Sequence, residues 1–160
     1  MRQVPTDTQS EGASRKKEVV RLWLRLASCE RSIEQRLRSH LSENFDITLP
    51  QFEVLCELDR SGPPIVMSRI SERLQVTSSN LTGVVDRLER KGLVTRFRSK
   101  KDRRVQHIEM TSEGRIAFTE IAADNALWVA RAFTELTDKE VIQLQDLLLK
   151  ASLSATKALT

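Results

Sequence analysis

From Lys16 to Phe45, apolar residues recur at the spacing of one helical face, which predicts a single long helix. The apolar positions are 19, 22, 23, 26, 33, 37, 41 and 45. Such a helix is roughly 45 Å long and needs a partner along its whole apolar face. That partner is either the core of a single chain or a second chain, and the length favours a dimer interface. The polar residues 1–14 before it predict a flexible tail.

A second helix is predicted after Thr48, where several helix-start signals lie close together. Thr48 can cap the helix, Pro50 is compatible with its first turn, and Gln51 stands three residues after the cap. The run Gly62-Pro63-Pro64 ends this helix.

Two shorter amphipathic helices follow. The first begins near Ser68 and would bury Ile70 and Leu74. The second begins at Thr77 and ends at Gly92, a residue type favoured just after a helix. Two short helices joined by a tight turn form a helix-turn-helix pattern.

Alternation of apolar and polar residues next predicts a β-hairpin. The segments LVTRFRS, residues 93–99, and RRVQHIEMT, residues 103–111, each contain β-branched residues and flank a polar tip, KKD. A hairpin placed directly after the second helix of a helix-turn-helix is a winged arrangement.

Two more amphipathic helices close the chain, over residues 112–133 and 137–158, and Thr137 and Glu140 form a capping box at the second start. The predicted fold is mainly α with a small β-hairpin wing, a winged helix-turn-helix dimerised through its N- and C-terminal helices. The predicted segments are a flexible N-terminal tail, an N-terminal dimerisation helix, a winged helix-turn-helix DNA-binding domain and C-terminal dimerisation helices, at residues 1–14, 15–47, 48–111 and 112–160.

The distribution of charge indicates a function for this fold. The chain carries a net charge of +4, but Ile65 to Thr111 holds eleven Lys or Arg against five Asp or Glu, which leaves −2 for the rest. A basic middle of this kind points first to nucleic acid. Its densest part is RSKKDRR, from Arg98 to Arg104, at the predicted hairpin tip.

Other classes of protein fit the sequence poorly. Cys29 and Cys56 lack disulfide or zinc spacing, and two histidines are too few for a metal cluster, so no metal or cofactor is expected. Cys29 and His40 would lie roughly 16 Å apart on one helix, beyond the reach of a nucleophile–base pair, and no enzyme is expected. The lack of a signal peptide or a long apolar run predicts a cytoplasmic protein without a membrane partner.

Candidate DNA contacts lie on the outward face of the second short helix and at the hairpin tip. Hydroxyl, amide and guanidinium groups reach base edges or phosphates, and narrow minor grooves attract arginine. The candidates are Ser68, Ser78, Ser79, Asn80, Thr82, Gly83, Arg87, Lys100, Lys101, Arg103 and Arg104. The alternatives without a DNA contact are a capping or packing role for Asn80, neutral surface variation at Gly83 and a solvated basic loop at the hairpin tip. Asp102, unsuited to a polyanion, is predicted to orient Arg104 through a carboxylate–guanidinium bond.

The stretch LERKGLVTRFRSKKDRRVQHIEMTSEG resembles the wing region of the MarR family, the dimeric bacterial multiple antibiotic resistance regulators. Asp102 and Arg104 match the family's D-x-R wing motif, and Met110-Thr111 stands where Leu-Thr is usual. The resemblance extends from about Arg15 to Thr160. It implies double-stranded DNA and a second copy of the chain as partners, the pairing of Asp102 with Arg104, and repression.

More locally, RLWLRLASCERSIEQRLR together with TLPQFEVL is similar to a branch of the family that controls the breakdown of hydroxycinnamates and related aromatic acids. That similarity implies a small aromatic or aryl-CoA ligand, for which Trp23, Arg25, Cys29 and Phe52 are candidate lining residues. Two alternatives remain open: a thiol-sensing regulator, although both cysteines are expected in the core, and a winged-helix protein-interaction module without specific DNA binding.

Overall fold

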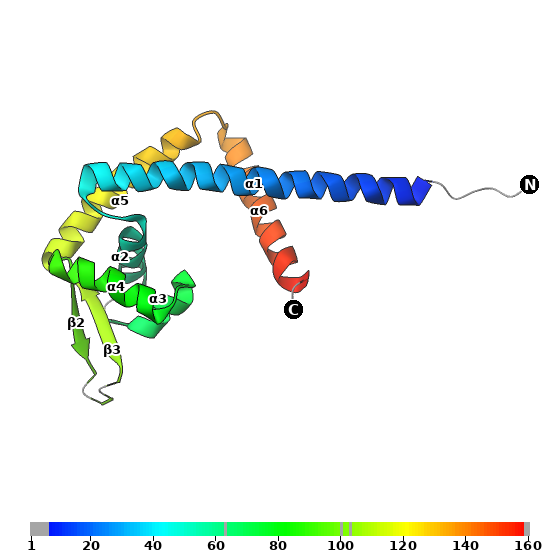
Figure 1. Cartoon of the computed structure of the whole chain (residues 1–160). Helices are drawn as coiled ribbons and strands as arrows, with labels where there is room; N and C mark the ends of the chain where they lie inside the picture. Colours follow the sequence, from blue (N-terminus) through cyan, green and yellow to red (C-terminus); the bar gives the residue numbers. More distant parts are fainter. Residues whose placement is uncertain (1–6, 63, 100, 103, 159–160) are drawn as a thin grey trace, which may run out of the picture. The chain divides into compact units, whose positions relative to one another are not determined.

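The computed structural model describes residues 7–62, 64–99, 101–102 and 104–158. Within these residues the chain forms six helices and three strands (Figure 1). In chain order they are α1 (Asp7–Phe45), α2 (Leu49–Ser61), β1 (Ile65–Val66), α3 (Met67–Leu74), α4 (Ser78–Arg90), β2 (Val94–Arg98), β3 (Gln106–Met110), α5 (Ser112–Ala132) and α6 (Asp138–Ala158). The mainly α fold with a small β wing is confirmed.

Helix α1 begins earlier than the sequence predicted. It starts at Asp7 and runs for 39 residues, so residues 7–14, assigned above to a flexible tail, are helical. Residues 1–6 lie outside the described residues. The extension costs little, because Gly12, the least favourable helix former among these residues, costs only about 1 kcal/mol relative to alanine. Once a helix has nucleated, each added residue costs little.

The winged helix-turn-helix has one apolar core, to which α2, α3, α4 and the sheet all contribute. The capping interaction predicted at Thr48 is present, since its backbone N–H donates to Oε1 of Gln51 at 2.8 Å. Gln51 is itself buried in the core. The largest fully buried side chains include Leu55, Ile70, Leu81, Leu88 and Ile108.

The wing is an antiparallel sheet with the strand order β1-β3-β2. Strands β2 and β3 pair from Val94 opposite Met110, and Ile65 of β1 lies opposite Ile108. Strand β1 was not predicted, because two residues are too few to show an alternating pattern. It forms only through pairing with a strand about forty residues later in the chain.

The start of α5 is fixed against the wing. The hydroxyl of Thr111 donates to the carbonyl of Gly92 at 2.7 Å and accepts from the N–H of Gly114 at 2.9 Å. A Cβ atom on Gly114 would lie 1.9 Å from the carbonyl oxygen of Leu93, so only glycine fits there. One helical turn later, the ring centroid of Phe118 lies 6.1 Å from the ring centroid of Phe52 in α2.

The chain divides into two compact units, Met1–Ile121 and Ala122–Thr160. The second unit contains the end of α5 and all of α6, and its exposed apolar side chains include Leu127, Ile142, Leu147, Leu149 and Leu153. In the first unit, Leu41 is the one buried side chain among those described in α1, while Val19, Leu22 and Trp23 are exposed.

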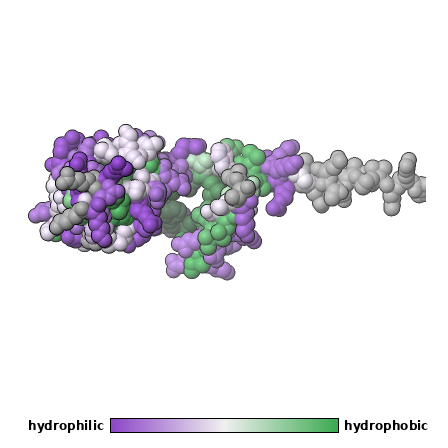
Figure 2. All heavy atoms as spheres, turned by 90° about the horizontal axis from the view of Figure 1, so that it is seen from below, coloured by the Kyte–Doolittle hydropathy of each residue, from purple (hydrophilic) through white to green (hydrophobic). Residues whose placement is uncertain are grey.

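Figure 2 shows that hydrophilic and hydrophobic side chains are both exposed at the surface and that each kind gathers in its own patches. Among the described residues, no helix has both the length and the apolar character that a membrane span requires.

Candidate nucleic-acid interface

Helix α4 separates an apolar face from a polar one. Leu81, Val84, Val85 and Leu88 are buried against the core. Thr77 caps the helix by accepting a hydrogen bond from the N–H of Asn80 at 3.3 Å. Ser78, Ser79, Thr82 and Arg87 are exposed. These four side chains therefore lie on the exposed side of α4, and their contacts with DNA stay a prediction.

Gly83 lies inside α4 on the side turned away from the core residues. A Cβ atom built on it would meet no heavy atom within 4 Å. Packing within the chain therefore does not require glycine at this position, although glycine costs about 1 kcal/mol in a helix interior relative to alanine.

A hollow of about 240 Å³ opens where α3 and α4 meet the part of the wing next to its tip. Its lining includes Ser68 at the start of α3, Ser78 and Thr82 on α4, and Arg104 of the wing. The hydroxyl of Thr82 donates to the carbonyl of Ser78 at 2.8 Å. First-turn residues of α3 and α4 and an arginine of the wing thus line one concave surface. Helix N-termini and arginine are both groups that favour an anion.

The other flank of α4 carries Asn80 and Arg87. Together with Pro50 and Glu53 of α2 they line a second hollow, of about 280 Å³. Burial raises the pKa of Glu53 above its ordinary value, against an opposing effect of Arg38. Arg87 is exposed.

The wing tip is organised by side-chain contacts to its backbone. Oγ of Ser99 accepts from the N–H groups of Lys101 at 3.2 Å and Asp102 at 3.4 Å. Oδ1 of Asp102 accepts from the backbone N–H of Arg104 at 2.9 Å. Asp102 therefore does contact Arg104, but through the backbone and not through the guanidinium bond that the sequence suggested. An aspartate two residues before an N–H forms such a turn readily. The predicted contacts at Lys100 and Arg103 lie outside the described residues.

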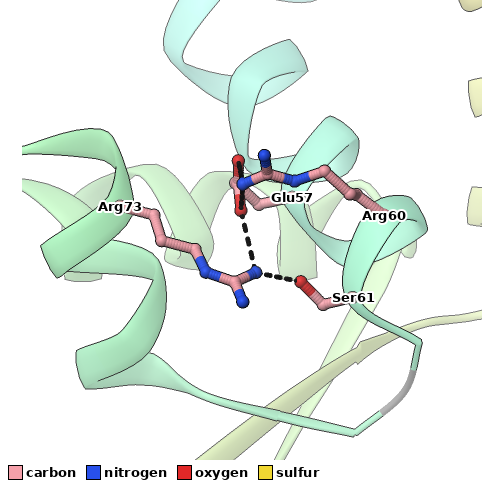
Figure 3. Close-up of polar contacts among 4 residues, drawn as sticks. All are labelled: Glu57, Arg60, Ser61 and Arg73. Carbon is pink, nitrogen blue, oxygen red and sulfur yellow. Dashed lines mark hydrogen bonds and ion pairs between the residues drawn. The ribbon is translucent and has the colours of Figure 1, made fainter. Parts of the chain in front are cut away.

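An acidic residue of α2 holds α3 in place (Figure 3). Nη2 of Arg60 donates to both carboxylate oxygens of Glu57, at 2.6 and 2.7 Å. Nη1 of Arg73 in α3 donates to Oε2 of Glu57 at 3.3 Å and also to the hydroxyl of Ser61. The hydrogen bond from Arg60 is the main cause that lowers the pKa of Glu57 below its ordinary value.

A second long-range contact joins the end of α1 to the end of α4. Nζ of Lys91, the residue after α4, donates to the carbonyl oxygen and the carboxylate of Asp46. Sequence reasoning singled out neither this pair nor the Glu57–Arg73 pair, since both join residues that are distant in the chain.

The structure does not bring the four predicted ligand-lining residues together within one chain. Trp23, Arg25 and Cys29 are exposed on α1. Phe52 is only 7% exposed and packs on Phe118, which makes it a core residue. Trp23 precedes the end of α1 by 22 residues, or ~33 Å of helix, whereas Phe52 lies in the first turn of α2.

The cysteines differ from each other in environment. Cys29 is exposed and Cys56 is half-buried. The expectation that Cys29 belongs to the core is wrong for the single chain, because α1 is buried only near its C-terminal end. Desolvation is the main cause that raises the pKa of the Cys56 thiol to about 11, and nearby carboxylates add to it. Cys56 is therefore a protonated thiol at neutral pH and a poor nucleophile.

The fold and this polar surface define a winged helix-turn-helix protein. The sequence model of the MarR family matches residues 47–105. MdtR of Bacillus subtilis (strain 168), an HTH-type transcriptional repressor, is 34% identical over 124 residues, which cover 76% of this chain and 79% of MdtR. The chain belongs to the MarR family of DNA-binding transcriptional regulators, not to a family of enzymes.

Solved structures of transcriptional regulators superpose on this fold. A MarR mutant from E. coli complexed with operator DNA superposes with a TM-score of 0.73 at 28% identity, covering 84% of this chain and 95% of that one. The regulator BldR from Sulfolobus solfataricus superposes with a TM-score of 0.71 at 27% identity, covering 84% and 96% of the two chains.

Proposed function

We propose that this regulator is a repressor that binds a pseudo-palindromic operator as a homodimer, with α4 in the major groove and the wing at the adjacent minor groove. The observation that carries the proposal is the hollow where Ser68, Ser78, Thr82 and Arg104 meet. Two relatives support it: MdtR is a repressor by name, and E. coli MarR has been solved on operator DNA.

A backbone phosphate suits this hollow. Ser68 and Ser78 stand in the first turns of α3 and α4, where unpaired N–H groups and the helix dipoles favour an anion. Arg104 adds a guanidinium that pairs with phosphate oxygens or enters a narrow groove. A phosphate bound here would fix the position of α4 along the DNA without reading its sequence.

From that position the exposed side of α4 would face the base edges. Ser79 and Thr82 can donate to bases or accept from them, and Gly83 lets the helix approach closely. Arg87 can reach a guanine or a phosphate from the flank, beside Asn80. Lys101 would lie near phosphates at the wing, as would the predicted contacts Lys100 and Arg103.

The proposed dimer follows from the apolar surfaces of α1, α5 and α6. A single chain leaves Leu22, Trp23, Leu149 and Leu153 between 55% and 64% exposed. Exposed apolar side chains of this size, present on α1 and on α6, are typical of an interface. Two-fold symmetry would then place two copies of α4 in successive major grooves, about 34 Å apart.

Release by a small ligand completes the proposed mechanism. The dimer would have two conformers: one in which the distance between the two copies of α4 matches the operator, and one in which it does not. A ligand that binds only the second conformer would draw the dimer into it and so lower its affinity for the operator. An aromatic or aryl-CoA ligand stays a prediction of the branch resemblance. Trp23, Arg25 and Cys29 would line its site only if a second chain completes it.

Selection of bound sequences from a random duplex DNA pool, at low and near-physiological salt, tests the proposal. A pseudo-palindrome recovered at both salt concentrations is expected. Binding at low salt alone, with no recurring sequence, would indicate generic charge attraction and would favour a protein-interaction module instead.

A further inference from the structure

Two carboxylates of α4 share one cation from the wing. Nη2 of Arg96 in β2 lies 2.7 Å from Oδ1 of Asp86 and 2.6 Å from Oε2 of Glu89. Nε of Arg96 also donates to Oε2 of Glu89 at 3.0 Å, and its backbone N–H donates to Oε1 at 3.3 Å. We name these three residues the Asp86–Arg96–Glu89 cluster.

The cluster matters because of the charge of α4 itself. The helix SSNLTGVVDRLER contains two acidic and two basic residues, so its own side chains carry no net charge. At ~100° per residue, Asp86 lies on the outward side of α4 together with Gly83 and Arg90. The opposite side is the buried one, with Leu81, Val85 and Leu88. Without a cation beside it, Asp86 would face the polyanion.

Arg96 is well placed to be that cation. Its side chain is 24% exposed, less than those of Asp86 at 41% and Glu89 at 37%. The hydrogen bond to Glu89 is the main cause that raises the pKa of Arg96 above its ordinary value. The Arg96 side chain therefore contacts the two carboxylates and is largely shielded from solvent.

We infer that Arg96 is a positioning residue for DNA binding, which neutralises Asp86 and Glu89 so that α4 can approach the phosphate backbone. The inference rests on the proposed function, since it requires the exposed side of α4 to face DNA. It differs from a purely structural role, in which Arg96 would only tie β2 to α4.

The test compares three proteins on the duplex that the wild type selects: wild type, Arg96→Met, and Arg96→Met combined with Asp86→Asn and Glu89→Gln. Arg96→Met should weaken binding roughly tenfold, because two uncovered carboxylates then face phosphates. The triple variant should recover affinity to within about threefold of the wild type, because no carboxylate remains to repel phosphates. Thermal melting of all three proteins shows which of them are folded.

A triple variant as weak as Arg96→Met, with both folded, would overturn the inference in favour of the structural tie. Unchanged affinity in Arg96→Met would overturn it as well. If Arg96→Met alone fails to fold, Asp86→Asn with Glu89→Gln on the wild-type background replaces it. That protein should bind at least as tightly as the wild type, and weaker binding contradicts the inference. Failure of the wild type to select any sequence would instead count against the proposed function.

Discussion

At the scale of single residues, Gly83 lies in the middle of α4 with open space where a side chain would be. Gly83→Ala should raise the free energy of unfolding by about 1 kcal/mol, because alanine is the better helix former. The same methyl group should weaken operator binding if the backbone of α4 approaches the groove closely at this point. Chemical denaturation and DNA titration measure the two effects separately.

Gly12 provides a matched control, since its Cβ position in α1 is also open. Gly12→Ala should leave DNA affinity unchanged. Equal affinity of Gly83→Ala and the wild type would assign Gly83 to neutral surface variation.

The contact between Asp102 and Arg104 gives a second residue-scale prediction. Because Oδ1 of Asp102 accepts from a backbone N–H, an amide oxygen can replace it. Asp102→Asn should therefore retain most of the operator affinity. Asp102→Ala has no side-chain oxygen to accept this hydrogen bond and should lose most of the affinity. Arg104→Ala should weaken binding and reduce the salt dependence by about one counterion. If Asp102→Asn binds as weakly as Asp102→Ala, a carboxylate–guanidinium pair forms on DNA after all.

The two cysteines should differ in reactivity. The pKa of Cys56 is raised to about 11, so only a very small fraction of its thiol is ionised at pH 7–8. Alkylation followed by mass spectrometry should label Cys29 first and Cys56 only after unfolding. Rapid labelling of Cys56 in the folded protein would contradict its assignment as an unreactive thiol and make it a candidate sensor.

At the scale of elements, Glu57 of α2 holds Arg73 of α3, and this contact should depend on pH. The pKa of Glu57 is lowered from its ordinary value of 4.5, so its stabilising contribution is complete above that pH and is lost as the pH falls through the lower folded value. Glu57→Gln should cost about 1–2 kcal/mol at neutral pH, a modest amount because both guanidinium partners are largely solvated.

Unfolding measured across pH should show the wild type and Glu57→Gln converging in stability below pH 4.5. Glu72→Gln, an exposed position on α3, is the matched control and should behave as the wild type. If the difference in free energy of unfolding between the wild type and Glu57→Gln stays constant with pH, the substitution removes packing and not a charge interaction.

The elements that were predicted correctly are those whose signals are local. Thr77 accepts the N–H of Asn80, and Thr137 and Glu140 bond each other at the start of α6, as their spacing indicated. Strand β1 and the Asp86–Arg96–Glu89 cluster were missed, because they depend on pairing between distant segments. The sequence did carry a signal for the cluster: Asp86 and Glu89 are spaced i, i+3 on a helix, and the strand that follows this helix is basic.

At the scale of the whole molecule, the proposed dimer should depend on α6. Leu149 and Leu153 are spaced one helical turn apart and are 62% and 57% exposed, so glutamate at both positions costs little in a single chain. Leu149→Glu with Leu153→Glu should shift the protein from dimer to monomer in sedimentation velocity and abolish tight operator binding. Ser154→Glu, an exposed polar position turned away from these two leucines on the same helix, should remain dimeric. A double variant that stays dimeric would remove this face of α6 from the interface.

The most direct test of the central claim is hydroxyl-radical footprinting on the duplex that the wild type selects. A dimer with one α4 in each half-site should protect two symmetry-related segments whose centres lie about 34 Å, or one turn of DNA, apart. Arg104→Ala should weaken protection at the minor-groove positions next to each segment. A single protected segment, or diffuse protection without symmetry, would contradict the dimeric winged-helix account.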